Sequence, residues 1–134
     1  MLKKINILLV DDVEFSRDLL RNVIKAVIDD DKLPLNPQFI QASSGRDVLE
    51  TIENKHIQLV YLDIDLPDIN GLEILKRIKK QFNDVVVVMV SGESSAANVM
   101  DAIKSGALGF IVKPFTSARV SDSLRNYLKT GAKI

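Results

Sequence analysis

Residues 85–90 form an unbroken apolar run, Val-Val-Val-Val-Met-Val, and this run most limits the folds open to the chain. Its side chains are mostly β-branched, which favours a strand. Because no polar residue alternates with the apolar ones, both faces of this strand are expected to be buried. A strand buried on both faces is typical of a parallel sheet that helices cover on each side. The chain is therefore expected to belong to the α/β class.

Four more strand-like segments are separated by segments with helical spacing. Strands are predicted at residues 5–10, 38–42, 59–62, 85–90 and 110–112. Helices are predicted along the apolar stripe of Leu19, Leu20, Val23, Ile24, Val27 and Ile28, from Ser43 or Ser44 to Asn54, at 72–82, from Ser94 or Ser95 to Gly106, and after Thr116 or Ser117. A polar loop with two prolines is predicted at 29–37. Alternation of this kind predicts a doubly wound (βα)5 sandwich, in which a five-stranded parallel sheet lies between two helical layers.

The composition excludes several classes of protein and of site. The 134 residues suit one domain, and 46% apolar with 27% charged residues predicts a folded chain. The 18 basic and 18 acidic residues balance, which gives no reason to expect nucleic acid or an anionic membrane as a direct partner. The absence of cysteine excludes disulfides and thiolate sites, and the single histidine excludes a site that needs two. Without a signal peptide or an apolar run of ~18 residues, the expected location is the cytoplasm.

Polar side chains with related chemistry follow four of the five predicted strands. They are Asp11, Asp12, Asp63, Ser91 and Lys113. Ligand sites of open parallel sheets lie beyond the carboxyl ends of the strands, so these side chains are expected to meet at one edge. Three carboxylates, a hydroxyl and an ammonium from four separate strands rarely come together by chance.

Three carboxylates at one edge repel one another, and each like-charged pair costs roughly 4 kcal/mol at ~4 Å and an effective dielectric constant of ~20. Such a cluster favours a hard divalent cation, and oxygen ligands with open positions favour Mg²⁺, which also binds phosphate oxygens. A carboxylate beside the metal can attack a phosphoryl group and form an acyl phosphate. A lysine adds a second positive charge, and a serine hydroxyl can bind a phosphoryl oxygen. The set therefore predicts phosphoryl transfer.

Four segments of the chain resemble the receiver domain of two-component response regulators, which has the flavodoxin-like, CheY-like fold. They are Leu-Leu-Val-Asp-Asp at 8–12, Leu-Asp-Ile-Asp-Leu-Pro-Asp-Ile-Asn-Gly-Leu-Glu at 62–73, Val-Ser-Gly at 90–92 and Gly-Ala-Leu-Gly-Phe-Ile-Val-Lys-Pro-Phe at 106–115. The resemblance covers nearly the whole chain, so residues 1–134 are expected to form one receiver domain. It also implies a cis peptide bond between Lys113 and Pro114.

The resemblance implies a phosphate acceptor and a Mg²⁺ site. Asp63 would accept the phosphoryl group. Asp12 and Asp63 would coordinate Mg²⁺ directly, together with the backbone carbonyl of Asp65. Asp11 would act mostly through a metal-bound water.

The resemblance also implies which groups bind the phosphoryl group and respond to it. Lys113 would pair with the phosphoryl group, and the Ser91 hydroxyl would move onto it. The backbone amides of Ile64 and Gly92 would cradle it. Phe110 stands at the family's aromatic switch position and would turn inward as Ser91 moves.

A receiver of this kind would take phosphate from a sensor histidine kinase or a histidine phosphotransfer protein and act as a switch, with only slow self-dephosphorylation as catalysis. Its output would pass through the surface around Phe110 and residues 95–130. No output domain is expected after the last helix, so the sequence fits either a single-domain regulator or a receiver from a longer chain. No direct contact with nucleic acid or membrane is expected.

Two other functions agree with parts of the sequence. One is a receiver-like module that binds its partner without phosphorylation, although such a module would not need the acidic set. The other is a haloacid-dehalogenase-type phosphatase, because Asp63-Ile64-Asp65 resembles its Asp-x-Asp motif. That motif normally lies on the first strand, which here has its own acidic pair. A calcium loop from Asp63 is excluded, since Asp68 and Ile74 stand where Gly and Glu are needed.

Two acidic residues depart from the usual receiver pattern or lie near its opening. Asp65 places a charge where receivers more often have none, and Glu93 follows Ser91 by two residues. Both are expected to alter the lifetime of the phosphorylated state. His56 is expected to be a surface residue, and the acidic run at 29–31 is expected to be a solvated loop rather than a metal site.

Overall fold

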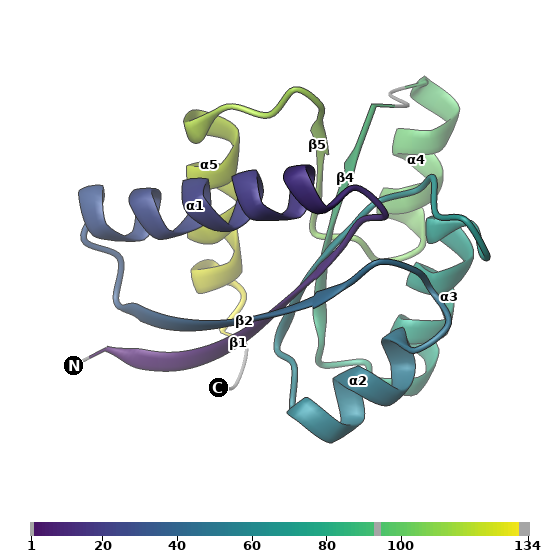
Figure 1. Ribbon diagram of the computed structural model, residues 1–134, viewed down its shortest axis with the longest axis horizontal. Coiled ribbons are helices and arrows are strands. Elements are labelled where there is room, and N and C mark those ends of the chain that lie inside the picture. The colour runs from purple at the N-terminus through teal and green to yellow at the C-terminus, as the bar shows by residue number, and fades with distance from the viewer. Residues whose placement is uncertain (1, 93–94, 132–134) are drawn as a thin grey trace.

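The computed structural model describes residues 2–92 and 95–131, in which five strands alternate with five helices. In chain order these elements are β1 (Lys3–Val10), α1 (Glu14–Asp30), β2 (Leu35–Ala42), α2 (Val48–Lys55), β3 (Leu59–Leu62), α3 (Gly71–Gln81), β4 (Val86–Ser91), α4 (Ala96–Lys104), β5 (Gly109–Val112) and α5 (Ser117–Lys129) (Figure 1). The order confirms the predicted (βα)5 alternation.

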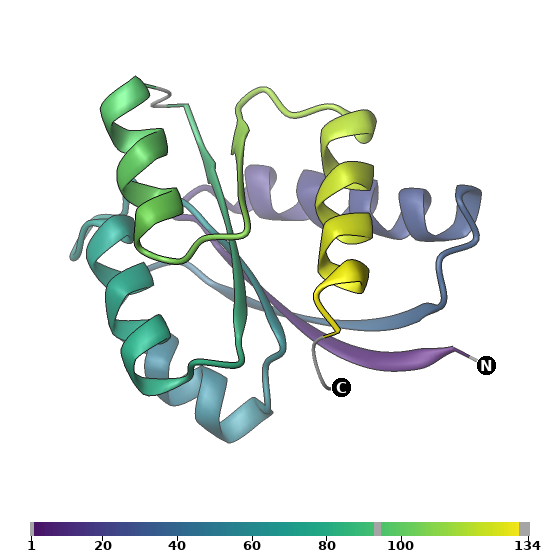
Figure 2. The same ribbon diagram turned by 180° about the vertical axis from the view of Figure 1, so that it is seen from behind.

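The five strands form one parallel sheet in the order β2-β1-β3-β4-β5. Helices α1 and α5 cover one face of the sheet, and α2, α3 and α4 cover the other (Figures 1 and 2). The strand order reverses at β1, which lies between β2 and β3. In doubly wound sheets a crevice forms beside such a reversal, beyond the carboxyl ends of the strands. The topology therefore places a binding site beyond β1 and β3.

Each face of the sheet has its own apolar core. One core contains Leu20, Ile24, Val120 and Leu124 from α1 and α5, and the other contains Leu75 and other residues of α2, α3 and α4. All six residues of β4 are buried, which confirms the expectation drawn from the apolar run at 85–90. Packing against both faces of the buried strands keeps the carboxyl edge of the sheet in a fixed position.

The second strand begins earlier than its pattern predicts. Helix α1 runs to Asp30 and β2 begins at Leu35, so the connecting loop is much shorter than the predicted loop at 29–37. Pro37 lies within β2, whereas the two prolines of this segment predict a loop. Proline is tolerated on an edge strand, where it need not break the ladder, and β2 is at the edge of the sheet.

Three helix details differ from the predictions or refine them. Helix α2 begins only at Val48, with Asp47 at its N-cap, so neither Ser43 nor Ser44 caps it. Leu19 is 44% exposed and is not part of the buried stripe of α1. Ser95 caps α4, while its alternative, Ser94, lies outside the described residues.

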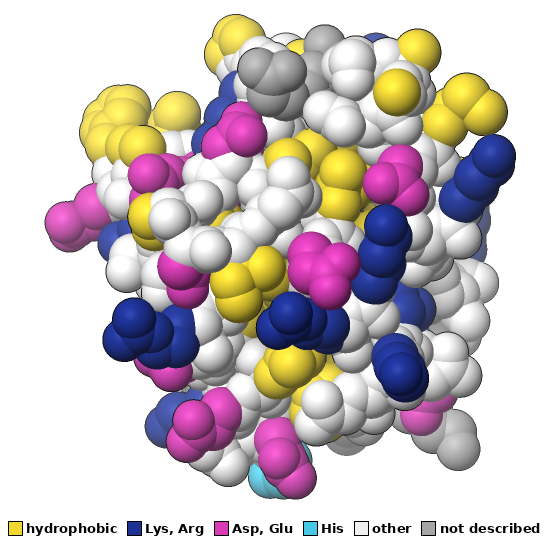
Figure 3. Space-filling view, turned by 90° about the vertical axis from the view of Figure 1, so that its right-hand side faces the viewer, with side chains coloured by type: hydrophobic (Ala, Val, Ile, Leu, Met, Phe, Trp, Pro, Cys, Tyr) yellow, Lys and Arg dark blue, Asp and Glu magenta, His cyan; other side chains and the backbone are white. Residues whose placement is uncertain are grey.

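Several smaller expectations are confirmed. Thr116 caps α5, the Lys113–Pro114 peptide bond is cis, and His56 is exposed. Basic and acidic side chains are interspersed on the surface of α2, α3 and α4 (Figure 3). In the part of the chain that the structure describes, no helix has both the length and the apolar character needed to cross a membrane.

Candidate functional site

The polar residues predicted at the strand ends do meet at the carboxyl edge of the sheet. Asp11 and Asp12 follow β1, Asp63 follows β3, and Lys113 follows β5, while Ser91 is the last residue of β4. The ladder continues one residue past the strands, because the Asp63 N–H donates to the Val10 carbonyl and the Lys113 N–H donates to the Ser91 carbonyl. The sheet itself thus fixes the backbone on which these side chains stand.

Lys113 joins two of the carboxylates. Its Nζ lies 2.6 Å from Asp11 Oδ2 and 3.0 Å from Asp63 Oδ2. The side chains of Lys113, Asp11 and Asp63 are 24%, 10% and 8% exposed, so water screens these ion pairs only partly. One ammonium therefore holds two carboxylates from neighbouring strands.

The carboxylate cluster fits a divalent cation. Asp11, Asp12 and Asp63 each offer a carboxylate oxygen, and these oxygens lie within 4.8 Å of one another. The single Lys113 ammonium leaves the cluster with net negative charge. Oxygen donors, excess negative charge and the exposed side of Asp12 match the preferences of Mg²⁺, which keeps part of its water shell. The residues present therefore suit Mg²⁺.

The two carboxylates that share Lys113 titrate differently. Burial acts to raise the pKa of Asp11, but hydrogen bonds from Lys113, the Val13 N–H and the Ser16 hydroxyl outweigh it and lower the pKa. Burial raises the pKa of Asp63, and the Asp11 charge acts in the same direction, against the opposing effect of Lys113. Asp63 has fewer donors than Asp11, which accounts for the opposite direction.

Lys113 remains a cation at this site. Burial acts to lower the pKa of its ammonium, but the hydrogen bonds and charges of Asp11 and Asp63 outweigh burial and raise the pKa. The site therefore presents a fixed positive charge next to the Asp63 carboxylate.

The start of α3 packs directly on the backbone of Asp63. A Cβ atom at Gly71 would lie 2.0 Å from the Asp63 carbonyl oxygen, so only glycine allows this approach. The Gly71 N–H donates to the Ile64 carbonyl at 2.8 Å, and the Asn70 side chain caps α3 by accepting from the Leu72 N–H. These contacts fix the loop that follows the predicted phosphate acceptor.

A second contact ties this loop to the neighbouring one. The Asp68 carboxylate accepts a hydrogen bond of 2.8 Å from the Gly45 N–H, between β2 and α2, and another from the Ile69 N–H. The Gly45 N–H, followed by other backbone N–H groups, lowers the pKa of Asp68. Because Asp68 remains ionised, it holds the two loops together near the cluster.

The residues predicted to bind the phosphoryl group are near the same edge. Ser91 is fully buried, and Ile64 is buried directly after Asp63. Gly92 is exposed, and a Cβ there would meet no atom within 4 Å, which leaves space beside its backbone. Phe110 is partly buried and packs against the core of the α2–α4 face. Alternation along β4 places Ser91 on the same face of the sheet as Met89, which pairs with Phe110.

The Asp65 side chain is not part of the carboxylate cluster. Asp65 is exposed, and its backbone N–H donates to Asp63 Oδ1 at 3.2 Å. Its carbonyl as a metal ligand stays a prediction. Glu93 lies outside the described residues.

Sequence reasoning missed two residues that contact the cluster from α1. The Ser16 hydroxyl helps to lower the pKa of the Asp11 carboxylate, and the Arg17 guanidinium donates to the Asp11 backbone carbonyl. Their only signal in the sequence is their place in the first turn after the acidic pair, where side chains can reach back toward the preceding strand end.

Comparisons with known proteins agree with this geometry. The sequence model described as the response regulator receiver domain matches residues 7–125. The chain is 34% identical to the chemotaxis protein CheY of Listeria monocytogenes over 125 residues, which cover 93% of this chain and 99% of the relative. A CheY-like receiver domain protein from Methanospirillum hungatei has 25% identity and a TM-score of 0.81, with 96% of each chain covered.

A further solved structure was determined with ligands. A chain from the CheX–CheY–BeF3–Mg²⁺ complex of Borrelia burgdorferi has 27% identity and a TM-score of 0.78, with 96% of this chain and 90% of that chain covered. The match over residues 7–125 assigns the Asp63-Ile64-Asp65 motif to a receiver rather than to a haloacid-dehalogenase-type phosphatase. The chain belongs to the family of response regulator receiver domains, the CheY-like signalling modules.

Proposed function

We propose that Asp63 accepts a phosphoryl group from a phosphohistidine of a partner protein in a Mg²⁺-dependent reaction. The observation that carries this proposal is the joining of Asp63 and Asp11 by the Lys113 ammonium, within a cluster of three carboxylates. Asp11, Asp12 and Asp63 would hold the ion, with the Asp65 carbonyl as a further ligand. The CheY complex from Borrelia burgdorferi, which contains BeF3 and Mg²⁺, supports the same chemistry here.

In the transfer step, a carboxylate oxygen of Asp63 attacks phosphorus. A P–O bond forms while the P–N bond of the phosphohistidine breaks, and its electron pair returns to the imidazole ring, which leaves as the neutral base after protonation. Mg²⁺, when bound, neutralises negative charge on the carboxylates and the phosphoryl oxygens. The Lys113 ammonium, already 3.0 Å from Asp63 Oδ2, supplies a second positive charge to the phosphoryl oxygens. The partner would be a sensor histidine kinase or a histidine phosphotransfer protein.

Phosphorylation would be read as a change of shape. The Ser91 hydroxyl and the amides of Ile64 and Gly92 would bind the phosphoryl oxygens, and Phe110 would then turn further into the space that Ser91 leaves. Output would pass through residues 95–130. Exposed apolar side chains of α4 and β5, Met100, Ile103 and Val112, support a protein partner on this surface.

The test is phosphorylation of the purified chain by a small phosphodonor with Mg²⁺. Wild type is expected to gain one phosphoryl group by mass spectrometry, and Asp63→Asn none, because the amide cannot form an acyl phosphate. Beryllofluoride with Mg²⁺ is expected to shift the NMR signals around Ser91 and Phe110. A wild type that neither gains phosphate nor responds to beryllofluoride contradicts the proposal and favours a phosphorylation-independent module.

A further inference from the structure

Arg17 of α1 makes a contact with the acidic site that does not involve a carboxylate. Its Nη1 donates to the backbone carbonyl of Asp11 at 2.5 Å, and its Nε donates to Gln41 Oε1 at 2.9 Å. Gln41, near the end of β2, in turn donates through Nε2 to Asp18 Oδ1 at 3.2 Å. The guanidinium is therefore held between the end of β1 and the end of β2.

The Asp11 carbonyl that Arg17 binds is not part of the hydrogen-bond ladder of the sheet. The Asp11 N–H still donates to the Ala42 carbonyl, and the Val10 carbonyl accepts from the Asp63 N–H. The Asp11 carbonyl comes after these ladder bonds, and the Arg17 guanidinium binds it instead. This carbonyl belongs to the peptide group that joins Asp11 to Asp12. Arg17 thus fixes the plane of that peptide group.

The two neighbouring carboxylates depend on this peptide group to different degrees. The Asp11 carboxylate is fixed by its own contacts with Lys113 and with the Val13 N–H. Asp12 is exposed, and no hydrogen bond or ion pair to another described residue holds its carboxylate. Its direction is set by its backbone, which begins at the peptide group that Arg17 binds.

We propose that Arg17 is a positioning residue for the Mg²⁺ site and that it acts through the Asp11–Asp12 peptide group on the Asp12 carboxylate. Gln41 supports this role because it holds the second edge of the guanidinium. The planar fork of arginine can bind both acceptors at once, whereas a lysine ammonium is a single point charge. The inference rests on the proposed Mg²⁺-dependent function and concerns a residue outside the metal ligands.

The test is calorimetric titration of Mg²⁺ into the purified chain and its variants. Arg17→Met is expected to raise the Mg²⁺ Kd about tenfold, the size of effect typical when a group that orients a metal ligand is removed. Arg17→Lys keeps the charge but loses the fork, so it is expected to recover only part of the affinity. Gln41→Leu is also expected to raise the Mg²⁺ Kd, because Arg17 is still present but has lost one of its two acceptors.

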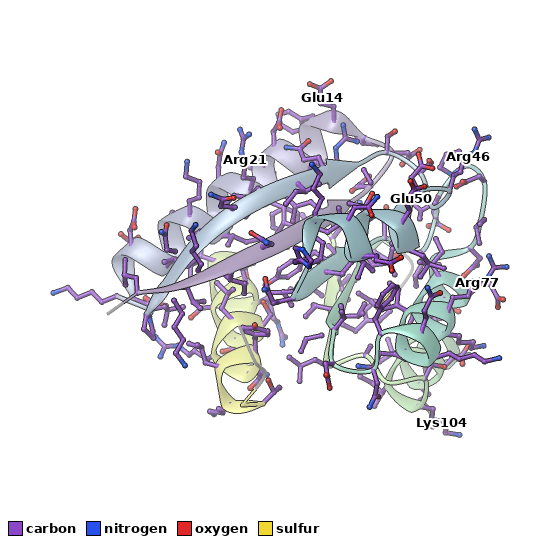
Figure 4. All side chains as sticks on the ribbon, turned by 90° about the horizontal axis from the view of Figure 1, so that it is seen from below. Glu14, Arg21, Arg46, Glu50, Arg77 and Lys104 are labelled. Atoms are coloured by element: carbon purple, nitrogen blue, oxygen red, sulfur yellow. The ribbon has the colours of Figure 1, made fainter. Side chains whose placement is uncertain are left out.

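Lys25→Met is the matched control. Arg21, one turn further along α1 than Arg17 (Figure 4), is unsuitable, because its Nη2 is 3.9 Å from Asp18 Oδ1, the same atom that Gln41 binds. Lys25 lies two turns further along α1 than Arg17 and is exposed. The control removes a positive charge from the same helix without touching the contacts of Arg17 and Gln41, so it is expected to bind Mg²⁺ like wild type. A loss of affinity in Lys25→Met equal to that in Arg17→Met would indicate a general effect of charge and would overturn the positioning role.

The possible results distinguish a failure of the positioning role of Arg17 from a failure of the proposed Mg²⁺-dependent function. Circular dichroism first establishes that each variant is folded at the temperature of the titration. If wild type binds Mg²⁺, Asp12→Asn binds it weakly and Arg17→Met binds it like wild type, the inference is wrong and the proposed function stands. If wild type does not bind Mg²⁺, both fail. If Arg17→Met does not fold, Gln41→Leu decides, and unchanged affinity in that variant overturns the inference.

Discussion

Gly71 places the predicted phosphate acceptor by having no side chain. The backbone of α3 begins against the Asp63 carbonyl, and a Cβ on Gly71 would lie 2.0 Å from that oxygen and 2.7 Å from the Ile64 Cα. Both neighbours are backbone atoms of a buried loop, so neither can move aside by changing rotamer. The position of the Asp63 carboxylate therefore depends on a residue eight positions later in the chain.

Gly71→Ala is expected to lower the free energy of unfolding by about 1–3 kcal/mol, because the added methyl group overpacks this contact. It is also expected to slow phosphorylation of Asp63, because the loop must shift. Urea unfolding and the rate of phosphate incorporation check the two effects.

Gly109→Ala is the control, since a Cβ there would meet no atom within 4 Å. It is expected to change neither the stability nor the phosphorylation rate by a comparable amount. Equal behaviour of the Gly71 and Gly109 variants would show that the close approach is unimportant.

At the scale of the elements, one buried hydrogen bond joins the strand that carries the acceptor to the last helix. Tyr61 of β3 and Ser123 of α5 are both buried, and their hydroxyl oxygens lie 2.7 Å apart. The Ser123 hydroxyl donates its single proton to the Val120 carbonyl, so the Tyr61 hydroxyl is the donor in the bond between them. The bond connects β3 and α5 across the core of the α1–α5 face.

Ser123→Ala is expected to destabilise the protein by about 1–3 kcal/mol, because it leaves the Tyr61 hydroxyl buried without an acceptor. The double variant Tyr61→Phe, Ser123→Ala removes both partners and is expected to be more stable than Ser123→Ala alone. Urea unfolding of the two single variants and the double variant measures the coupling. Additive effects in this cycle would mean that the hydrogen bond contributes nothing specific.

The elements also show which parts of the fold the sequence predicts and which it does not. Strand β4 was predictable because burial on both faces leaves an unbroken apolar run, and Asp63 and Lys113 were predictable because strand ends converge. The start of β2 was not, since an edge strand with polar residues and Pro37 resembles a loop. The role of Arg17 was not predictable either, because its contact with Asp11 depends on the distance between two elements.

At the scale of the whole molecule, both tyrosines of the chain are buried, and this affects stability at high pH. Burial raises the pKa of Tyr61, with a smaller opposing effect from the hydrogen bond with Ser123, and burial also raises the pKa of Tyr127. Unfolded tyrosines ionise near pH ~10. Above that pH the unfolded chain therefore holds fewer protons than the folded chain, and the free energy of unfolding falls as the pH rises.

Urea unfolding between about pH 8 and pH 11 is expected to show this loss of stability. Tyr61→Phe removes one of the two buried hydroxyls, so its stability is expected to fall less steeply with pH than that of wild type. Tyrosinate absorbance is expected to rise together with unfolding. Equal slopes for wild type and Tyr61→Phe would contradict the prediction.

Pro37 on the edge strand β2 also affects how the molecule behaves toward other copies of itself. The Lys3 N–H donates to the Pro34 carbonyl, and the Asp11 N–H donates to the Ala42 carbonyl. In this parallel pair the backbone N–H and C=O groups of the even-numbered residues of β2 therefore point toward β1, and those of the odd-numbered residues point away from it. The ring nitrogen of Pro37 consequently faces outward, where an incoming strand from another chain would need an N–H donor. The sheet is thereby a poor template for edge-to-edge aggregation along β2.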